Sequence, residues 1–170
     1  FREDVRLMKS IGLQAYRFSI SWPRLIPDGR GRVNPEAVTF YNSLLDELHS
    51  HRITPMVTLY HWDLPQVLED EYEGWLGKQI LDDFEQYAAA CFSCFGDRVK
   101  YWVTINEPWC AAVLGYATGE HAPGHTMRPL YEPYMAAHHM ILAHARAVKR
   151  YRNDFRAKQS GKIGLVLNMD

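Results

Sequence analysis

The chain has 170 residues, of which 47% are hydrophobic and 13% aromatic, a composition typical of a folded globular protein and not of a disordered one. Its 19 lysine and arginine residues nearly balance its 20 aspartate and glutamate residues, so the net charge of −1 gives no basic surface for nucleic acid or an anionic membrane. No apolar run approaches the roughly 18 residues needed to cross a bilayer.

Helical and extended patterns alternate along the first half of the chain. Val5, Met8 and Ile11 fall at helical spacing and precede a strand predicted over residues 15–21. Asn34-Pro35 is typical of a helix start, with an amide cap and a proline in the first turn. The buried face of that helix is expected to comprise Ala37, Tyr41, Leu44 and Leu48. Residues 55–60 then predict a buried strand.

The alternation continues in the second half. The next helix is expected to end at Gly96, placed at the position after the cap. Its apolar face comprises Ile80, Phe84, Tyr87, Ala88, Cys91 and Phe95. A strand over 101–105 follows, and after a turn-rich loop comes a long helix. The apolar face of this helix comprises Ala136, Met140, Ala143 and Ala147. Gly161 precedes a last strand over 163–167.

This order of elements predicts an α/β fold with a parallel sheet built from right-handed crossovers. A doubly wound sheet and part of a (β/α)₈ barrel both fit. Polar residues follow each strand, as in barrel active sites, whereas no glycine-rich phosphate-binding loop follows any strand. A whole barrel needs about 250 residues, so we expect residues 1–170 to form a single domain segment, roughly half of a barrel.

The sharpest chemical feature is the run Thr104-Ile105-Asn106-Glu107-Pro108. A buried strand ends in a carboxyl group, and partial burial there would favour the protonated form that a general acid needs. Asn106 can both donate to and accept from a sugar hydroxyl. The alternative is a structural glutamate paired with a neighbouring cation, which the run by itself leaves open.

Two further runs place polar and aromatic groups at strand ends. His61 and Trp62 follow the second strand, and an imidazole beside an indole suits the hydroxyl edge and the apolar face of a sugar ring. Arg17 lies within an otherwise apolar strand, where we expect it to be buried and to need a carboxylate partner that the sequence does not reveal. A lone histidine of this kind is more often structural.

Together the runs YRFSISWPR, VTLYHWDLP and TINEPW closely resemble glycoside hydrolase family 1, and their spacing matches as well. The resemblance extends through FGDRVKYW, GYATGEHAPG, AAHHMILAHARAVK and GKIGLVLN, and so covers essentially the whole chain. It implies a (β/α)₈ barrel enzyme, a β-glucosidase-like hydrolase of β-glycosidic bonds that retains configuration.

The resemblance also implies roles for individual residues. Glu107 would be the general acid/base, and Arg17 would orient the catalytic nucleophile. The residues expected to bind substrate are His61, Asn106, Trp62, Trp109 and Asn168. Trp109 and Asn168 would lie towards the aglycone, the part of the substrate that departs. The substrate would be a small β-glucoside or oligosaccharide, and no cofactor or metal is implied.

The chain departs from the family pattern because it holds no T-E-N-G-like motif, which supplies the family's nucleophile late in the chain. It also begins without an initiator methionine. We therefore expect a segment running from the first barrel helix to the fifth strand, upstream of which the natural product begins, and we expect the isolated segment to be inactive. Alternatives are a carbohydrate-binding pseudoenzyme and, less consistent with exposed sheet edges, an independent interaction domain.

Several further features are interpreted as structural and not functional. The odd number of cysteines predicts no disulfide framework and favours a reducing, cytoplasmic compartment. Cys91 and Cys94 fall inside a helix, so core packing is expected for Cys91 in place of redox chemistry. The histidines do not show metal-ligand spacing: His121, His125, His138, His139 and His144. The charged run 69–71 is interpreted as a solvated face.

Overall fold

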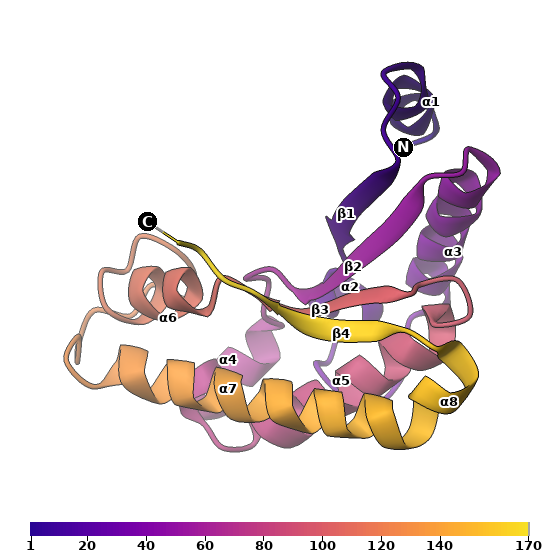
Figure 1. Cartoon of the computed structure of the whole chain (residues 1–170). Coiled ribbons are helices and arrows are strands. Elements are labelled where there is room, and N and C mark those ends of the chain that lie inside the picture. The colour runs from indigo at the N-terminus through magenta and orange to yellow at the C-terminus, as the bar shows by residue number, and fades with distance from the viewer. Residues whose placement is uncertain (170) are drawn as a thin grey trace.

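The computed structural model describes residues 1–169, and its centre is one sheet of four parallel strands. The strands are β1 (Ala15–Ser19), β2 (Thr54–Tyr60), β3 (Tyr101–Asn106) and β4 (Lys162–Val166). They lie side by side in sequence order, β1-β2-β3-β4. A doubly wound sheet reverses its order at a switch point, so this sequential order agrees with the barrel alternative (Figure 1).

The four predicted helices are present, and shorter helical segments lie between them. The long helices are α1 (Arg2–Ser10), α3 (Pro35–Ser50), α5 (Ile80–Phe95) and α7 (Glu132–Arg150). The short segments are α2 (Trp22–Leu25), α4 (Gln66–Tyr72), the 3₁₀ turn η1 (Gly74–Leu76), α6 (Pro108–Tyr116), the π-helical turn η2 (Tyr151–Phe155) and α8 (Arg156–Gln159). The strand predicted over 15–21 was therefore too long, because Trp22-Pro23 starts α2.

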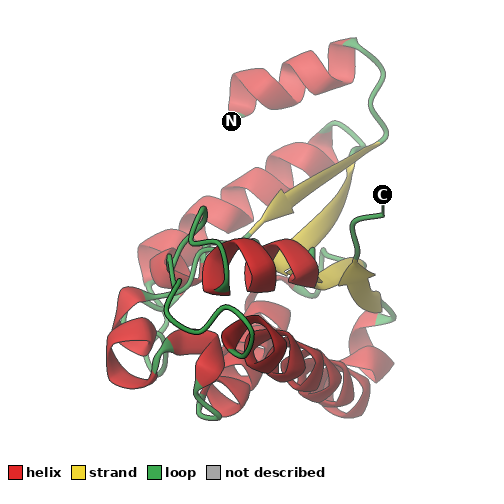
Figure 2. Ribbon diagram, turned by 90° about the vertical axis from the view of Figure 1, so that its left-hand side faces the viewer, coloured by secondary structure: helices red, strands yellow, loops and turns green. Residues whose placement is uncertain are grey.

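The helices form a layer against the sheet. Figure 1 shows α4, α5 and α7 together on one side of β3 and β4, and Figure 2 shows α1 at the far end of the molecule beyond β1. The central strands β2 and β3 are almost wholly buried, whereas β1 and β4 are partly exposed edges. Burial of apolar area, worth about 25 cal/mol per Å², thus concentrates between the central strands and the α5–α7 layer.

Aromatic rings fill much of this layer. Phe92 of α5 lies edge-on to Trp102 of β3 at 5.0 Å and to Tyr151 at 4.9 Å between ring centroids. Such arrangements match the charge distribution of the rings and add to simple area burial. Cys91 is fully buried beside them, and burial raises the pKa of its thiol, so the predicted packing role is confirmed.

The predicted helix faces are confirmed for α3, α5 and α7, whose named apolar residues are all buried. Asn34 caps α3 as predicted, with its Oδ1 accepting from the Glu36 amide at 3.0 Å. Two details were wrong. Ile11 lies past the end of α1 and is 67% exposed. Gly96 has an ordinary φ of −72°, and a Cβ there would lie 2.1 Å from the Gln159 side chain, so close approach explains this glycine.

Candidate active site

The carboxyl ends of β1, β2 and β3 meet at one edge of the sheet, where Asn106 connects them. Its side chain is buried, and its Oδ1 accepts a hydrogen bond from Arg17 Nη1 at 2.9 Å. Its Nδ2 lies 3.3 Å from His61 Nε2. The strand register makes this possible, because Ser19 pairs with Thr58 and Tyr60 with Ile105. A buried amide bonded at both ends is a rigid link between neighbouring strands.

Arg17 differs from its sequence-based expectation in one respect. It was expected to be buried against a carboxylate, but in the described chain it is exposed, and its hydrogen-bond partner is the Asn106 amide oxygen. The reason is its place on β1, which is an edge strand with a partner on one side only. Solvent access removes the need for an ionic partner that full burial would impose.

Trp62 extends the cluster to a fourth side chain. Its Nε1 donates to the backbone oxygen of Asn106 at 2.8 Å, and its ring lies 5.0 Å from the His61 ring. The backbone of Trp62 has φ +77°, in the left-handed region that a bulky side chain rarely adopts. Direct contacts between the strand ends thus join four side chains into one cluster: Arg17, His61, Asn106 and Trp62.

Glu107 directly follows Asn106 and turns the chain from β3 into α6. Its backbone has φ +44° and ψ +71°, its N–H donates to Val166 O at 2.8 Å, and its carbonyl accepts from Ala111 at 3.1 Å. Its side chain is half-buried. Left-handed backbone at a residue other than glycine costs about 1–3 kcal/mol and persists where the surroundings demand it. The turn therefore gives Glu107 a fixed place at the strand-end edge.

Asp63 also lies in this region, although no role was predicted for it from the sequence. Burial raises the pKa of its carboxyl, while hydrogen bonding from the Ser21 side chain opposes that shift. Ser21 in turn donates its backbone N–H to Tyr41 Oη at 2.8 Å. Oδ1 of Asp63 is buried and has no hydrogen-bond partner among the described residues. Its position directly after Trp62 was the only signal available in the sequence.

Trp109 and Asn168 lie apart from these contacts. Trp109 is 56% exposed on α6 and lines a hollow of about 320 Å³ between α6 and the start of α7, with Leu130 and Tyr134. Asn168 is half-buried and lies two residues beyond the end of β4. The structure therefore brings the glycone-side candidates into contact with one another, whereas the two aglycone-side candidates take no part in these contacts.

The remaining histidines make contacts of a structural kind. Within residues 1–169, His, Cys, Asp and Glu side chains form no group of three arranged to hold a metal ion. His139 Nδ1 instead contacts the carbonyl oxygen of Trp75 at 2.7 Å. No helix in the same residues combines the length and apolar character needed to cross a membrane.

Comparison with known proteins agrees with this architecture. A family model described as glycosyl hydrolase family 1 matches residues 1–170. The chain is 50% identical to β-glucosidase 6 of Oryza sativa and 50% identical to the coniferin β-glucosidase of Pinus contorta, in each case over 99% of its length. It spans about a third of the curated relatives it matches, 34% and 35% of these two.

Solved structures show the same fold. A rice β-glucosidase superposes with a TM-score of 0.96 at 50% identity, over 99% of this chain and 37% of the rice chain. A β-glucosidase from Thermotoga maritima in complex with castanospermine gives 0.93 at 48% identity, over 99% and 37%. The predicted fold class, a partial (β/α)₈ barrel, is confirmed. Since one family model accounts for all 170 residues, the chain belongs to glycosyl hydrolase family 1.

Proposed function

We propose that the full-length protein containing this chain hydrolyses β-glucosidic bonds with retention of configuration and releases a terminal glucosyl residue from small β-glucosides or oligosaccharides. The observation that carries the proposal is the strand-end cluster in a chain of this family. A left-handed turn presents Glu107 beside Asn106, whose amide links Arg17 to His61. The similar proteins named above as β-glucosidases support the choice of substrate.

In this proposal Glu107 acts twice. It first donates a proton to the glycosidic oxygen as the bond to the anomeric carbon breaks, while a second carboxylate outside this chain attacks that carbon from the opposite face. A covalent glycosyl-enzyme forms and the aglycone leaves as an alcohol. Glu107, now ionised, then removes a proton from the water that attacks the same carbon. The two carboxyl groups of a retaining enzyme lie about 5 Å apart.

The neighbouring side chains would bind the sugar and place the second carboxylate. His61 and Asn106 offer hydrogen bonds to glycone hydroxyls, and Trp62 offers an apolar ring beside them. Arg17 would orient the nucleophile, since a guanidinium suits a carboxylate well. Trp109 and Asn168 are proposed to contact the aglycone, since both are accessible and lie apart from the contacts of the cluster.

The proposal is tested by Glu107→Gln in the full-length protein. Hydrolysis of cellobiose, whose leaving group must be protonated, should fall by about 10²–10⁴-fold. An aryl glucoside with an activated leaving group should lose less in the glycosylation step, and azide should restore turnover by giving a β-glucosyl azide. Glu36→Gln, an exposed glutamate in the first turn of α3, is the matched control.

Two outcomes would contradict the proposal. Near-normal cellobiose turnover by Glu107→Gln would remove Glu107 from the acid/base role. A wild-type protein that binds glucosides but turns none over would favour the carbohydrate-binding pseudoenzyme instead. Cellobiose turnover and calorimetric titration with glucose together separate these cases.

A further inference from the structure

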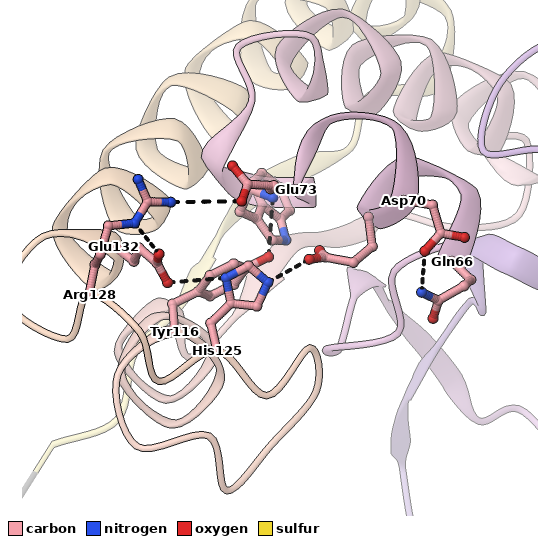
Figure 3. A network of polar contacts seen from close by, with 9 residues as sticks. Gln66, Asp70, Glu73, Tyr116, His125, Arg128 and Glu132 are labelled. Atoms are coloured by element: carbon pink, nitrogen blue, oxygen red, sulfur yellow. Dashed lines mark hydrogen bonds and ion pairs between the residues drawn. The ribbon is translucent and has the colours of Figure 1, made fainter.

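The loop over residues 117–131, between α6 and α7, contacts the candidate site at one point and is anchored at another. His121 lies against Trp62, with 5.0 Å between ring centroids. His125, four residues later, lies within a cluster of charged residues (Figure 3). Two residues of one loop thus connect the strand-end cluster to a separate polar network.

His125 is held by two carboxylates from different helices. Its Nε2 lies 2.7 Å from Glu69 Oε1 of α4, and its Nδ1 lies 3.1 Å from Glu132 Oε2 of α7. Its ring packs against Tyr116 of α6 at 5.1 Å between centroids. Figure 3 shows the His125 ring between two dashed contacts, one of which leads to Glu132. Three helices therefore meet at this one side chain.

Counting hydrogen-bond donors shows that a neutral ring between two ionised carboxylates cannot satisfy both contacts. An ionised carboxylate only accepts hydrogen bonds, and a neutral imidazole has a single N–H. Two contacts to two carboxylates therefore need one additional proton within the trio, either on the ring or on a carboxyl group. Burial raises the pKa of Glu69, whereas the hydrogen bond and the charge interaction with His125 oppose that shift. Charge-assisted bonds of this type are roughly twice as strong as neutral ones.

The carboxylate of Glu132 makes the bridge hard to replace. Its side chain is only 2% exposed, and its other oxygen, Oε1, accepts from Arg128 Nε at 2.6 Å. Arg128 also lies 3.7 Å from Glu73. Both partners of the Glu132 side chain, His125 and Arg128, come from the loop over residues 117–131. A buried carboxylate that loses a partner is strongly destabilised, so the charge of Glu132 holds the loop in place.

Backbone hydrogen bonds hold both His121 and His125 against α6. The N–H of His121 donates to Leu114 O at 3.0 Å, and that of His125 donates to Gly115 O at 2.9 Å. A Cβ at residue 115 would lie 2.9 Å from Ala122 O, so the glycine lets the loop pack directly on α6. His121 and His125 are consequently fixed to the same helix by short contacts.

We propose that His125 is a positioning residue for the candidate site, where its bridge from Glu69 to Glu132 holds the 117–131 loop so that His121 packs on Trp62. Trp62 in turn contacts the Asn106 backbone through its indole N–H. The effect on catalysis rests on the proposed function, but the effect on Trp62 does not. The residue acts through other side chains and does not itself touch the reacting atoms.

The test uses the full-length protein and the exchange rate of the Trp62 indole hydrogen, measured by NMR and assigned with Trp62→Phe. His125→Ala should accelerate this exchange about tenfold and lower kcat/KM for an aryl glucoside about tenfold, mainly through KM, since misplaced binding groups have effects of at least this size. His125→Arg, a permanent cation with several N–H donors, should restore both quantities to within about twofold. His51→Ala removes a histidine–glutamate pair on α3 and is the matched control.

A double-mutant cycle with His121→Ala separates positioning from general destabilisation. If the loop acts through His121, adding His125→Ala to His121→Ala should change Trp62 exchange by less than about twofold, because the shared contact is already gone. Additive effects, or unchanged exchange in His125→Ala, would overturn the proposal. Altered exchange in a protein without glucosidase activity would uphold the positioning role and reject the proposed function.

Discussion

Arg52 and Trp62 both have left-handed backbone, at opposite ends of β2. At the amino ends of the strands, Arg52 (φ +59°) follows α3 and Ser160 (φ +54°) follows α8, where a left-handed residue commonly ends a helix. At the carboxyl ends, Trp62 (φ +77°) and Glu107 (φ +44°) follow strands and end no helix.

The difference separates residues that are needed for their backbone conformation from residues that are needed for their side chains. A helix end needs only the backbone shape, and glycine supplies that shape at least cost. The strand ends hold an indole and a carboxyl in the same strained shape, although glycine would fit more easily. The left-handed backbone at Trp62 and Glu107 costs about 1–3 kcal/mol at each residue. That this cost is tolerated indicates that the side chains themselves are required there.

The largest expected effect concerns the strand-end site, because a helix end is local whereas the proposed retaining reaction needs a second carboxylate beside Glu107. We predict that the isolated 170-residue chain shows no β-glucosidase activity above background and tends to aggregate, since its unpaired sheet edges expose backbone hydrogen-bonding groups. An aryl-glucoside assay with size-exclusion chromatography checks this. A monomer with turnover would place a nucleophile within these residues.

A smaller effect distinguishes the two kinds of left-handed residue directly. Ser160→Gly should raise the free energy of unfolding by about 1 kcal/mol without changing activity, because glycine relieves the strain at an exposed helix end. Ser50→Gly, inside the last turn of α3, should lower it by about the same amount. Denaturant unfolding measures both. A loss of activity in Ser160→Gly would contradict the proposal that only the left-handed residues at the carboxyl ends of the strands serve the site.

The smallest effect comes from His144 of α7, which contacts Thr104 of β3 through Nδ1 at 2.8 Å. Burial lowers the pKa of His144 below its ordinary 6.5, so between these values the unfolded chain binds a proton that the folded chain does not. Stability should therefore fall as the pH is lowered through 6.5, and solvent access to the half-buried ring keeps the effect small.

His144→Gln keeps a polar partner for Thr104 and should flatten that part of the pH profile. His138→Gln, at an exposed position on the same helix, serves as the control and should leave the profile unchanged. Melting temperatures between pH 5 and pH 8 provide the measurement. Equal profiles for wild type and His144→Gln would show that other groups set the acid response.

Periodic patterns predicted the long elements well because each buries one face. The faces of α5 and α7 follow directly from apolar spacing, as do the buried strands β2 and β3. Short segments such as α4 and α6 were missed, because a helix of two turns or so leaves little periodicity to detect. Pro108 directly follows the strand-end carboxyl group and begins α6, a helix that the sequence patterns did not predict.

At the site, the strand-end side chains could be identified from their runs and the family resemblance, but their contacts could not. The amide of Asn106 as the partner of Arg17 joins residues 89 positions apart. Glu69 belonged to a run interpreted as solvated, yet its side chain is 15% exposed and bound to His125, 56 positions away. Pairings between distant loops leave no local pattern, so only the folded chain reveals them.

The two-sided bonding of Asn106 also determines where a hydrogen atom sits on His61. Arg17 can only donate, so the amide must present its oxygen to Arg17 and its NH₂ to His61. The His61 nitrogen that receives this hydrogen, Nε2, is then the unprotonated one, and the hydrogen of the neutral ring must reside on Nδ1. An arginine on the first strand thereby selects the tautomer of a histidine beyond the second, through the orientation of a single amide.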